Sequence, residues 1–162
     1  MLTSKIIEDL NYRIQQEEFS SRLYKQMSLW LNDEGFINLS KIYEKYSQEE
    51  MSHAGWAEEF LLSHGIKPSL KIIEAPNDVY EINSLKDILD LTLSHEKDIT
   101  NQCNDLASLA LKENSHTLYS LASKYCHEQV EELEKAITFL DIYSKTKDEL
   151  FYDHYIGELY LD

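Results

Sequence analysis

Four long segments of this chain repeat apolar residues at steps of three and four, and each is interrupted by an acid at its centre. Such a repeat is typical of amphipathic α-helices that bury one face. The interrupting acids are Glu17, Glu50, Glu96 and Glu132. A buried unpaired carboxylate is costly, so each must be paired, protonated or bound to a metal ion. Any fold for this chain must bury these four helix faces and also compensate the charges of the four carboxylates.

The repeat also predicts which residues face inward. In the first segment these are Ile7, Leu10, Ile14, Glu17, Ser21, Tyr24, Ser28 and Leu31. In the second they are Leu39, Tyr43, Tyr46, Glu50, His53, Ala57 and Phe60. In the third they are Leu85, Leu89, Thr92, Glu96, Ile99, Cys103, Leu106 and Ala110. In the fourth they are Leu118, Ala122, Tyr125, Gln129, Glu132, Ala136, Phe139 and Tyr143. Four helices of this kind predict an all-α fold.

Local signals mark where these helices begin and end. Thr3 or Ser4 can cap the first helix, and Ser84 can cap the third. The segment Asn32–Gly35 marks a turn after the first helix, and Gly65 is a C-terminal signal for the second. A further aromatic-rich segment, 148–161, predicts a short fifth helix.

The connections between the helices predict their directions. Residues 66–83 contain both prolines and no sustained period, which indicates a long connection. Roughly twenty extended residues reach about 60 Å, whereas a helix of about 28 residues is about 42 Å long. The connection can therefore span the bundle and make the third helix parallel to the second. The short turn 113–115 then makes the fourth antiparallel. We expect residues 1–162 to form a single domain, a four-helix bundle with a long crossover.

The four acids lie near the middle of their helices, so they should meet at one level of the bundle. Glu50 and His53 are three residues apart and share one helical face. Together these side chains predict a dinuclear metal site. Glu50 would bridge two ions, Glu17 and His53 would complete one half, and Glu96 and Glu132 the other. An oxygen-rich set with one imidazole suits iron or manganese better than structural zinc.

Several neighbouring residues are candidates for supporting roles. Gln129 would lie outside the ligand set and could steer a water or dioxygen. Tyr24 could hydrogen-bond a ligand or donate an electron, or simply be a core tyrosine. Three further acids beside the inward positions could hold a third, weaker ion or form a solvated face; they are Glu49, Glu128 and Glu131. The neighbouring histidines, His95 and His127, are expected to point off the inward face and are left out.

Composition excludes some partners. Thirty acidic and fifteen basic residues give a formal charge of −15, which argues against nucleic-acid binding. No apolar run is long enough to predict a membrane span, and the amino terminus shows no signal-peptide segment. Cys103 and Cys126 are not in a CxxC motif, which favours reduced thiols and a cytoplasmic location.

The motifs around these acids resemble those of the bacterial non-haem ferritins. The resemblance extends over essentially the whole chain, and every ligand position is filled. The segments that carry it are 17–24 (EEFSSRLY), 48–53 (QEEMSH), 95–97 (HEK) and 128–132 (EQVEE). The resemblance implies a ferritin-like bundle assembled as a hollow 24-subunit shell. It implies a ferroxidase that oxidises Fe(II) with dioxygen or peroxide and stores the Fe(III) product as a mineral. It also implies a third iron site from Glu49, Glu128 and Glu131, with Glu132 shared.

Two positions bear on variants of this family. Lys124 stands where the family often has an aromatic residue, next to Tyr125, which could slow or reroute electron delivery. Met51 falls at the haem-ligand position of bacterioferritin, but that family has a second Glu-x-x-His motif. Here the equivalent, Glu128 to Glu131, has no histidine, so we expect no haem.

Of three other functions considered from the sequence, one is disfavoured and two remain open. A Dps-like DNA protector would need a basic tail and ligands shared between subunits, and neither is seen. A di-iron oxidase or peroxidase acting on another substrate would bind an iron pair without storing mineral. A metal-free helical interaction protein would satisfy its central acids by hydrogen bonds alone.

Overall fold

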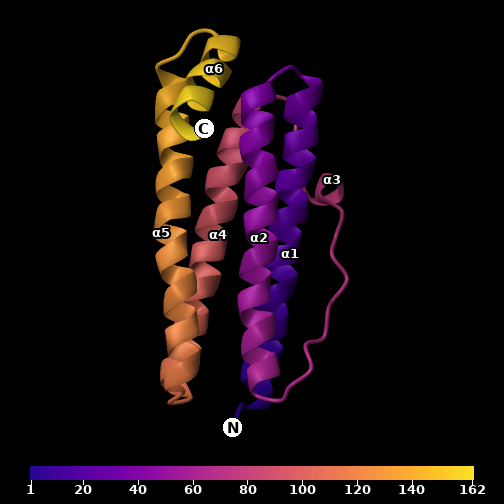
Figure 1. The fold of residues 1–162 in the computed structure, drawn as a ribbon, viewed down its shortest axis with the longest axis vertical. Helices are drawn as coiled ribbons and strands as arrows, with labels where there is room; N and C mark the ends of the chain where they lie inside the picture. The colour runs from indigo at the N-terminus through magenta and orange to yellow at the C-terminus, as the bar shows by residue number, and fades with distance from the viewer.

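Six helices and no strands make up the computed structural model, which describes residues 1–162. In chain order they are α1 (Ser4–Asp33), α2 (Ile37–Ser63), α3 (Pro76–Val79), α4 (Leu85–Lys112), α5 (His116–Ser144) and α6 (Glu149–Tyr160). The four long helices lie side by side as a bundle, α1 against α2 and α4 against α5 (Figure 1). The all-α four-helix architecture with a short additional C-terminal helix is therefore confirmed. None of the six helices has an apolar stretch that would reach across a lipid bilayer.

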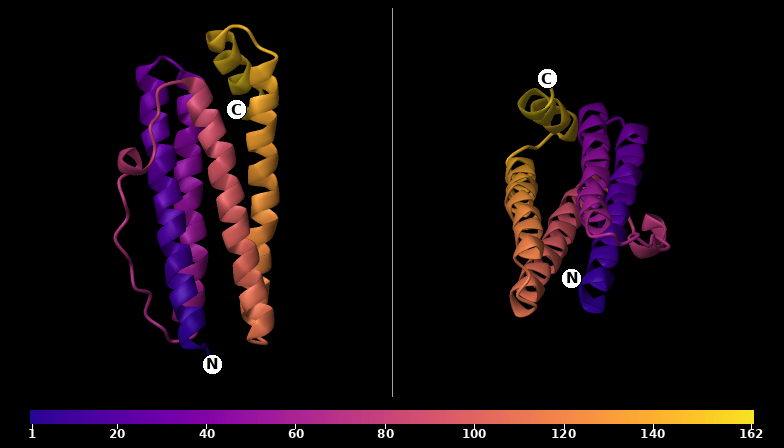
Figure 2. Two further views of the ribbon diagram at one scale, coloured as in Figure 1. Left: turned by 180° about the vertical axis from the view of Figure 1, so that it is seen from behind. Right: turned by 60° about the horizontal axis from the view of Figure 1, so that its bottom comes forward.

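The connection between α2 and α4 runs the full length of the bundle beside α1 (Figures 1 and 2). Gln15 of α1 donates from Nε2 to the Ile72 carbonyl at 2.8 Å, and Asn11 Oδ1 accepts from the Ser69 N–H at 2.9 Å. These bonds fasten the crossover to α1. As predicted, α4 runs parallel to α2 and α5 returns antiparallel (Figure 2). The four-residue helix α3, which begins at Pro76, was not predicted.

Three of the long helices end in a residue with left-handed backbone geometry. The φ angles are +89° at Gly35, +73° at Gly65 and +52° at Asn114. In each case the next N–H bonds to the carbonyl five residues earlier, at 2.8 to 2.9 Å; the pairs are Phe36–Leu31, Ile66–Leu61 and Ser115–Ala110. This pattern satisfies carbonyls that a helix end leaves unpaired. The predicted stops at these three turns are confirmed.

Helix α2 begins without a side-chain cap of its own, and α6 supplies one. The Asp153 carboxylate accepts from the Leu39 N–H at 2.7 Å and from the Asn38 N–H at 3.2 Å. These are early N–H groups that an N-terminal cap normally satisfies. Gly157, one turn after Asp153, allows the close approach, because a Cβ there would lie 2.7 Å from Asn38 Cγ. The C-terminal helix is thereby joined to the start of α2.

The apolar core is divided into two clusters. One lies towards α6 and includes Leu31, Leu39 and Leu85, whereas the other lies towards the amino terminus and includes Leu10 and Leu61. Between the clusters every long helix contributes buried polar side chains; they include Glu17, Ser20, Ser21, Ser47, Glu50, His53, His95, Glu96, Gln129 and Glu132. A polar layer therefore crosses the middle of the bundle, as the central acids predicted.

At two helix ends the predicted inward residue packs against the core, but its neighbour is more deeply buried. Ile6 is 2% exposed, while Ile7 is only partly buried. Leu61 is fully buried, while Phe60 is only partly buried. Near the end of a helix, packing against one partner can select either of two adjacent positions, which the repeat alone does not distinguish.

Replacing Asp153 with alanine should lower the free energy of unfolding by about 1–2 kcal/mol, since two helix N–H groups lose their acceptor. Urea denaturation followed by circular dichroism measures this change. Glu158→Ala, an exposed acid on the same helix, is the matched control and should change the unfolding free energy little. Equal stability for the two variants would contradict the capping role.

Candidate metal centre

The four central acids converge with one histidine in the polar layer. Glu17, Glu50, Glu96 and Glu132 come from α1, α2, α4 and α5, and none is more than 5% exposed. His53 lies one turn after Glu50 on α2 and is also buried. Two sets of ligand atoms lie within 4.8 Å of one another: Glu17, Glu50 and His53 form one, and Glu50, Glu96 and Glu132 the other. We call them the His53 half and the Glu96 half; Glu50 belongs to both.

In the His53 half, the imidazole faces two carboxylates. Its Nδ1 lies 2.9 Å from Glu50 Oε2 and 3.9 Å from Glu17 Oε2. The other oxygen of Glu17, Oε1, lies 3.1 Å from Nε of Arg13. Arg13 is 2% exposed and was missed in the sequence analysis. Its spacing of four residues before Glu17 is the signal that could have identified it.

In the Glu96 half, hydrogen bonds orient one carboxylate. The Tyr24 hydroxyl donates to Glu96 Oε1, and Gln129 Nε2 donates to Glu96 Oε2 at 2.8 Å. Both donors are buried and neutral. The structure thus places Tyr24 and Gln129 beside the same acid. Lys135 reaches the other terminal acid of this half, with its Nζ 3.7 Å from Glu132 Oε1.

Burial makes three of these acids, Glu50, Glu96 and Glu132, hard to ionise when no cation is bound. Burial is the main cause of the raised pKa of Glu50, and the neighbouring Glu17 carboxylate raises it further. Burial likewise raises the pKa of Glu96, against the effect of its two hydrogen-bond donors. The pKa of Glu132 is raised by burial to about 8. A bound cation would offset this cost.

The residues present fit a pair of oxygen-preferring divalent cations. Within the two halves, two buried carboxylate oxygens, Glu17 Oε2 and Glu132 Oε1, have no hydrogen-bond partner; a third such oxygen, Glu18 Oε1, lies outside both halves. Such atoms are rare in folded proteins and mark places where an ion or water can bind. The two unpartnered oxygens lie in different halves, and Glu50 can reach both. Four carboxylates and one imidazole form a donor set suited to iron or manganese.

The acids considered for a third ion lie at the edge of this cluster. Glu49 and Glu128 are partly buried, and Glu131 is exposed. None of the three belongs to either half. Glu128 comes nearest, with Oε1 3.6 Å from Nε2 of His53.

His95 was wrongly placed off the inward face. It is 5% exposed, and its Nε2 lies 2.7 Å from the Ser20 hydroxyl of α1. Burial lowers the pKa of His95 to about 4, so the ring is neutral near pH 7. The α1–α4 interface buries a position that the periodicity of α4 alone leaves at its edge. His127, by contrast, is exposed.

The sequence has Lys124 where an aromatic residue was expected next to Tyr125, but Trp56 of α2 lies close to this position. The Trp56 ring of α2 lies 5.2 Å from the Tyr125 ring and 4.7 Å from the His53 ring, measured between centroids. The Lys124 ammonium lies 4.0 Å from the centre of the Trp56 ring. The aromatic contact next to Tyr125 is thus supplied by α2.

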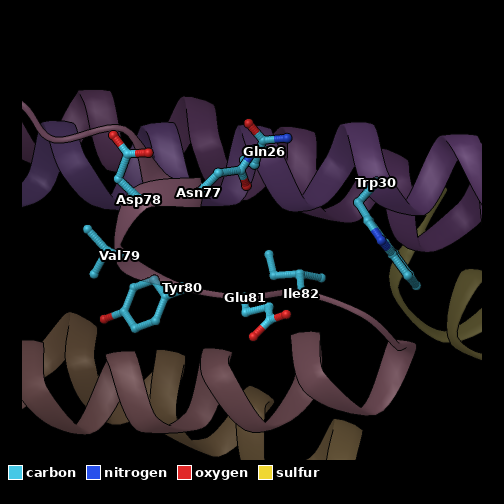
Figure 3. Close-up of a pocket in the computed structure, with 8 residues that line it drawn as sticks. All are labelled: Gln26, Trp30, Asn77, Asp78, Val79, Tyr80, Glu81 and Ile82. Atoms are coloured by element: carbon cyan, nitrogen blue, oxygen red, sulfur yellow. The ribbon is translucent and has the colours of Figure 1, made fainter.

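The space at the acids is small compared with hollows elsewhere on the protein. The cavity that touches Glu96 and Glu132 measures about 10 Å³, which is about enough for one water molecule. A hollow of about 550 Å³ lies instead between α1 and the crossover, beside Trp30 and Tyr80 (Figure 3). None of the predicted site residues lines that hollow. The buried cluster is sized for ions.

Comparison with known proteins agrees with this arrangement. A family model described as a ferritin-like domain matches residues 7–145. The chain is 33% identical over 141 residues to a probable bacterial non-heme ferritin-like protein of Haemophilus influenzae, covering 87% of this chain and 84% of that one. It is 30% identical over 155 residues to a bacterial non-heme ferritin of Escherichia coli O6:H1, covering 94% and 93%.

Solved structures show the same fold. An open pore ferritin from Archaeoglobus fulgidus superposes with a TM-score of 0.90 at 26% identity, covering 97% of this chain and 98% of the other. A structure described as a humanized archaeal ferritin gives a TM-score of 0.93 at 25% identity, covering 100% and 98%. The family model, the sequence relatives and the fold agree, and the chain belongs to the ferritin family.

Proposed function

We propose that this protein is a ferroxidase and iron-storage protein of the non-haem ferritin type. It binds two Fe(II) ions as substrates, oxidises them with dioxygen or hydrogen peroxide, and deposits the Fe(III) product as a mineral inside a shell of identical chains. The observation that carries the proposal is the pair of buried ligand sets sharing Glu50. Glu17 and His53 hold one ion, and Glu96 and Glu132 hold the other.

The charge of the cluster suits the reduced substrate better than the oxidised product. Two Fe(II) ions carry four positive charges, against four carboxylates of which Arg13 already offsets one. Each ion gives up one electron, so the pair supplies the two electrons that convert dioxygen and two protons into hydrogen peroxide. Oxidation to two Fe(III) ions would add two further positive charges to a buried site, which favours their release. This imbalance lets the site pass its product to the mineral.

The remaining residues have supporting roles in this proposal. Tyr24 and Gln129 hold the Glu96 carboxylate in place through their hydrogen bonds. Glu49, Glu128 and Glu131, with Glu132 shared, form a third and weaker iron site. The position of Glu128 near His53 Nε2 supports it, because an ion there would lie next to the pair.

Two competing functions fit the structure less well. An oxidase acting on an organic substrate needs room beside its metal ions, and binding pockets usually measure hundreds of cubic ångströms. The cavity of about 10 Å³ at Glu96 and Glu132 has no such room. A metal-free interaction protein would have to leave Glu17 Oε2 and Glu132 Oε1 buried without partners, at considerable cost.

Assembly and location are also part of the proposal. We infer a shell of 24 chains in the cytoplasm, with residues 1–162 as one domain. Exposed apolar side chains on the crossover support self-association: Ile72 is 91% exposed and Leu70 is 64% exposed. Both cysteines, Cys103 and Cys126, are free thiols, which suits a reducing compartment.

Replacing Glu50 with alanine should remove the shared ligand and weaken both halves together. Removing a residue that only hydrogen-bonds to a metal ligand typically lowers activity roughly 10- to 100-fold. Because Glu50 is itself a ligand, we expect Fe(II) oxidation to slow by more than this. Stopped-flow absorbance of Fe(III) measures the rate. Glu59→Ala, an exposed acid on the same helix, is the control. Unchanged oxidation in the Glu50 variant would refute the proposed site.

Affinity for divalent ions should rise with pH, because the acids must lose protons to bind. Burial raises the pKa of Glu132 to about 8, so we expect the apparent affinity for Co²⁺ to rise about tenfold or more per pH unit from pH 6 to 8. Above about pH 8 the affinity should level off, as isothermal titration calorimetry can measure. An affinity independent of pH would contradict the proposal.

The same raised pKa values predict the pH dependence of the metal-free fold. Glu132 has an ordinary pKa of 4.5 when unfolded and about 8 when folded. Between these values the folded state holds a proton that the unfolded state has lost, so stability falls as the pH rises. Thermal denaturation of metal-free protein from pH 5 to 8 should show this decline, and saturating Co²⁺ should reduce it. A melting temperature that rises over this range would contradict the raised pKa.

A further inference from the structure

Arg13 is among the most deeply buried side chains of the molecule. Its guanidinium carbon lies 5.9 Å from the centre of the Tyr125 ring, and its Nε lies 3.1 Å from Glu17 Oε1. Burial alone would lower the pKa of Arg13, but the nearby Glu17 carboxylate contributes to raising it above its ordinary value. The contact with Glu17 is an ion pair by distance, because neither Nε nor Nη2 of Arg13 has a partner in hydrogen-bonding geometry. A fixed positive charge therefore lies beside one ligand of the proposed iron pair.

Stability does not explain this ion pair. A buried salt bridge often contributes less than a pair of well-packed apolar residues would, because both charges lose their hydration. On an exposed helix, an arginine four residues before a glutamate is also the weaker of the two orientations. We therefore look for the role of the ion pair in its effect on the charge of Glu17 as a metal ligand.

The ion pair makes the two halves of the cluster unequal. In the His53 half, Arg13 occupies one oxygen of Glu17 and balances its charge, leaving only Oε2 directed at His53. In the Glu96 half, the donors to Glu96 are the neutral Tyr24 and Gln129. The lysine near Glu132 is one-third exposed and 3.7 Å away, so solvent weakens its effect. Once a cation has displaced the protons from its carboxyl groups, the Glu96 half therefore carries more uncompensated negative charge than the His53 half.

We propose that Arg13 is a positioning residue that ranks the two halves, so that a divalent cation fills the Glu96 half first and the His53 half second. This inference rests on the proposed function, because it concerns the same pair of ions. The second ion, held by Glu17 Oε2, Glu50 and His53, is then the one that exchanges with solution.

The order of filling can be measured on the unmodified protein with Co²⁺, which reports coordination without the iron reaction. X-ray absorption at the cobalt edge detects imidazole by its outer-shell scattering. At one Co²⁺ per chain we expect oxygen donors and no imidazole signal, and at two per chain the imidazole signal should appear. Imidazole scattering at the first equivalent would overturn the proposed ranking. Failure to bind Co²⁺ at all would instead refute the proposed iron site.

Substitutions at Arg13 test whether its charge sets the order. Arg13→Gln removes the charge, and at the effective dielectric of a protein interior a nearby unit charge changes divalent affinity by at least about tenfold. Calorimetric titration should therefore show the second Co²⁺ step tightening by about tenfold or more, towards the first. Arg13→Lys keeps the charge and should restore the separation of the two steps.

Lys135→Gln is the matched control, since it removes a cation that is one-third exposed and lies beside the Glu96 half. It should leave the second step unchanged. Circular dichroism and size-exclusion chromatography establish whether each variant folds and assembles. If Arg13→Gln does not fold, the X-ray absorption measurement on the unmodified protein still tests the order in which the two halves fill. An Arg13→Gln variant that folds and retains two separate steps would overturn the role of Arg13, as would an Arg13→Lys variant that behaves like it.

Discussion

The structure depends on burying four carboxylates at one level of a helical bundle. Two apolar clusters, one on each side of this level, hold the helices together and keep water out. The same exclusion of water makes the acids costly, and it raises the pKa values of Glu50, Glu96 and Glu132. Hydrogen bonds and Arg13 compensate only part of this charge. The bundle is therefore arranged to gain stability from divalent cations at its centre.

Features far from the centre keep the four acids at one level. The crossover is fastened to α1 by Gln15 and Asn11, and it returns the chain to the end where α2 starts. Helices α2 and α4 consequently run in the same direction, and the middle of each falls at the same height. Asp153 joins α6 to the first N–H groups of α2. By fixing the positions of the helix ends, these contacts also fix the level at which the central acids lie.

Much of the fold and the central acids could be predicted from the sequence, because helical period, caps and turn residues are local signals. Glu17, Glu50, His53, Glu96 and Glu132 were named as a cluster and are brought together. Their role as iron ligands remains a proposal. Arg13, His95 and Trp56 were not placed in the same way. For Arg13, the spacing of four residues before Glu17 was a signal that was missed. His95 and Trp56 lie at the edge of the inward face of their helices, where only the neighbouring helix decides whether a residue is buried.

The central claim is that the buried cluster feeds a store of iron, and the amount of iron retained tests it most directly. Metal-free protein would receive excess Fe(II) in air, and iron would then be counted in the protein peak of a calibrated size-exclusion column. We expect iron far beyond the two or three ions that the ligands can hold, eluting with a large assembly. Iron that stops at two or three per chain, or that does not elute with the protein, would contradict the account.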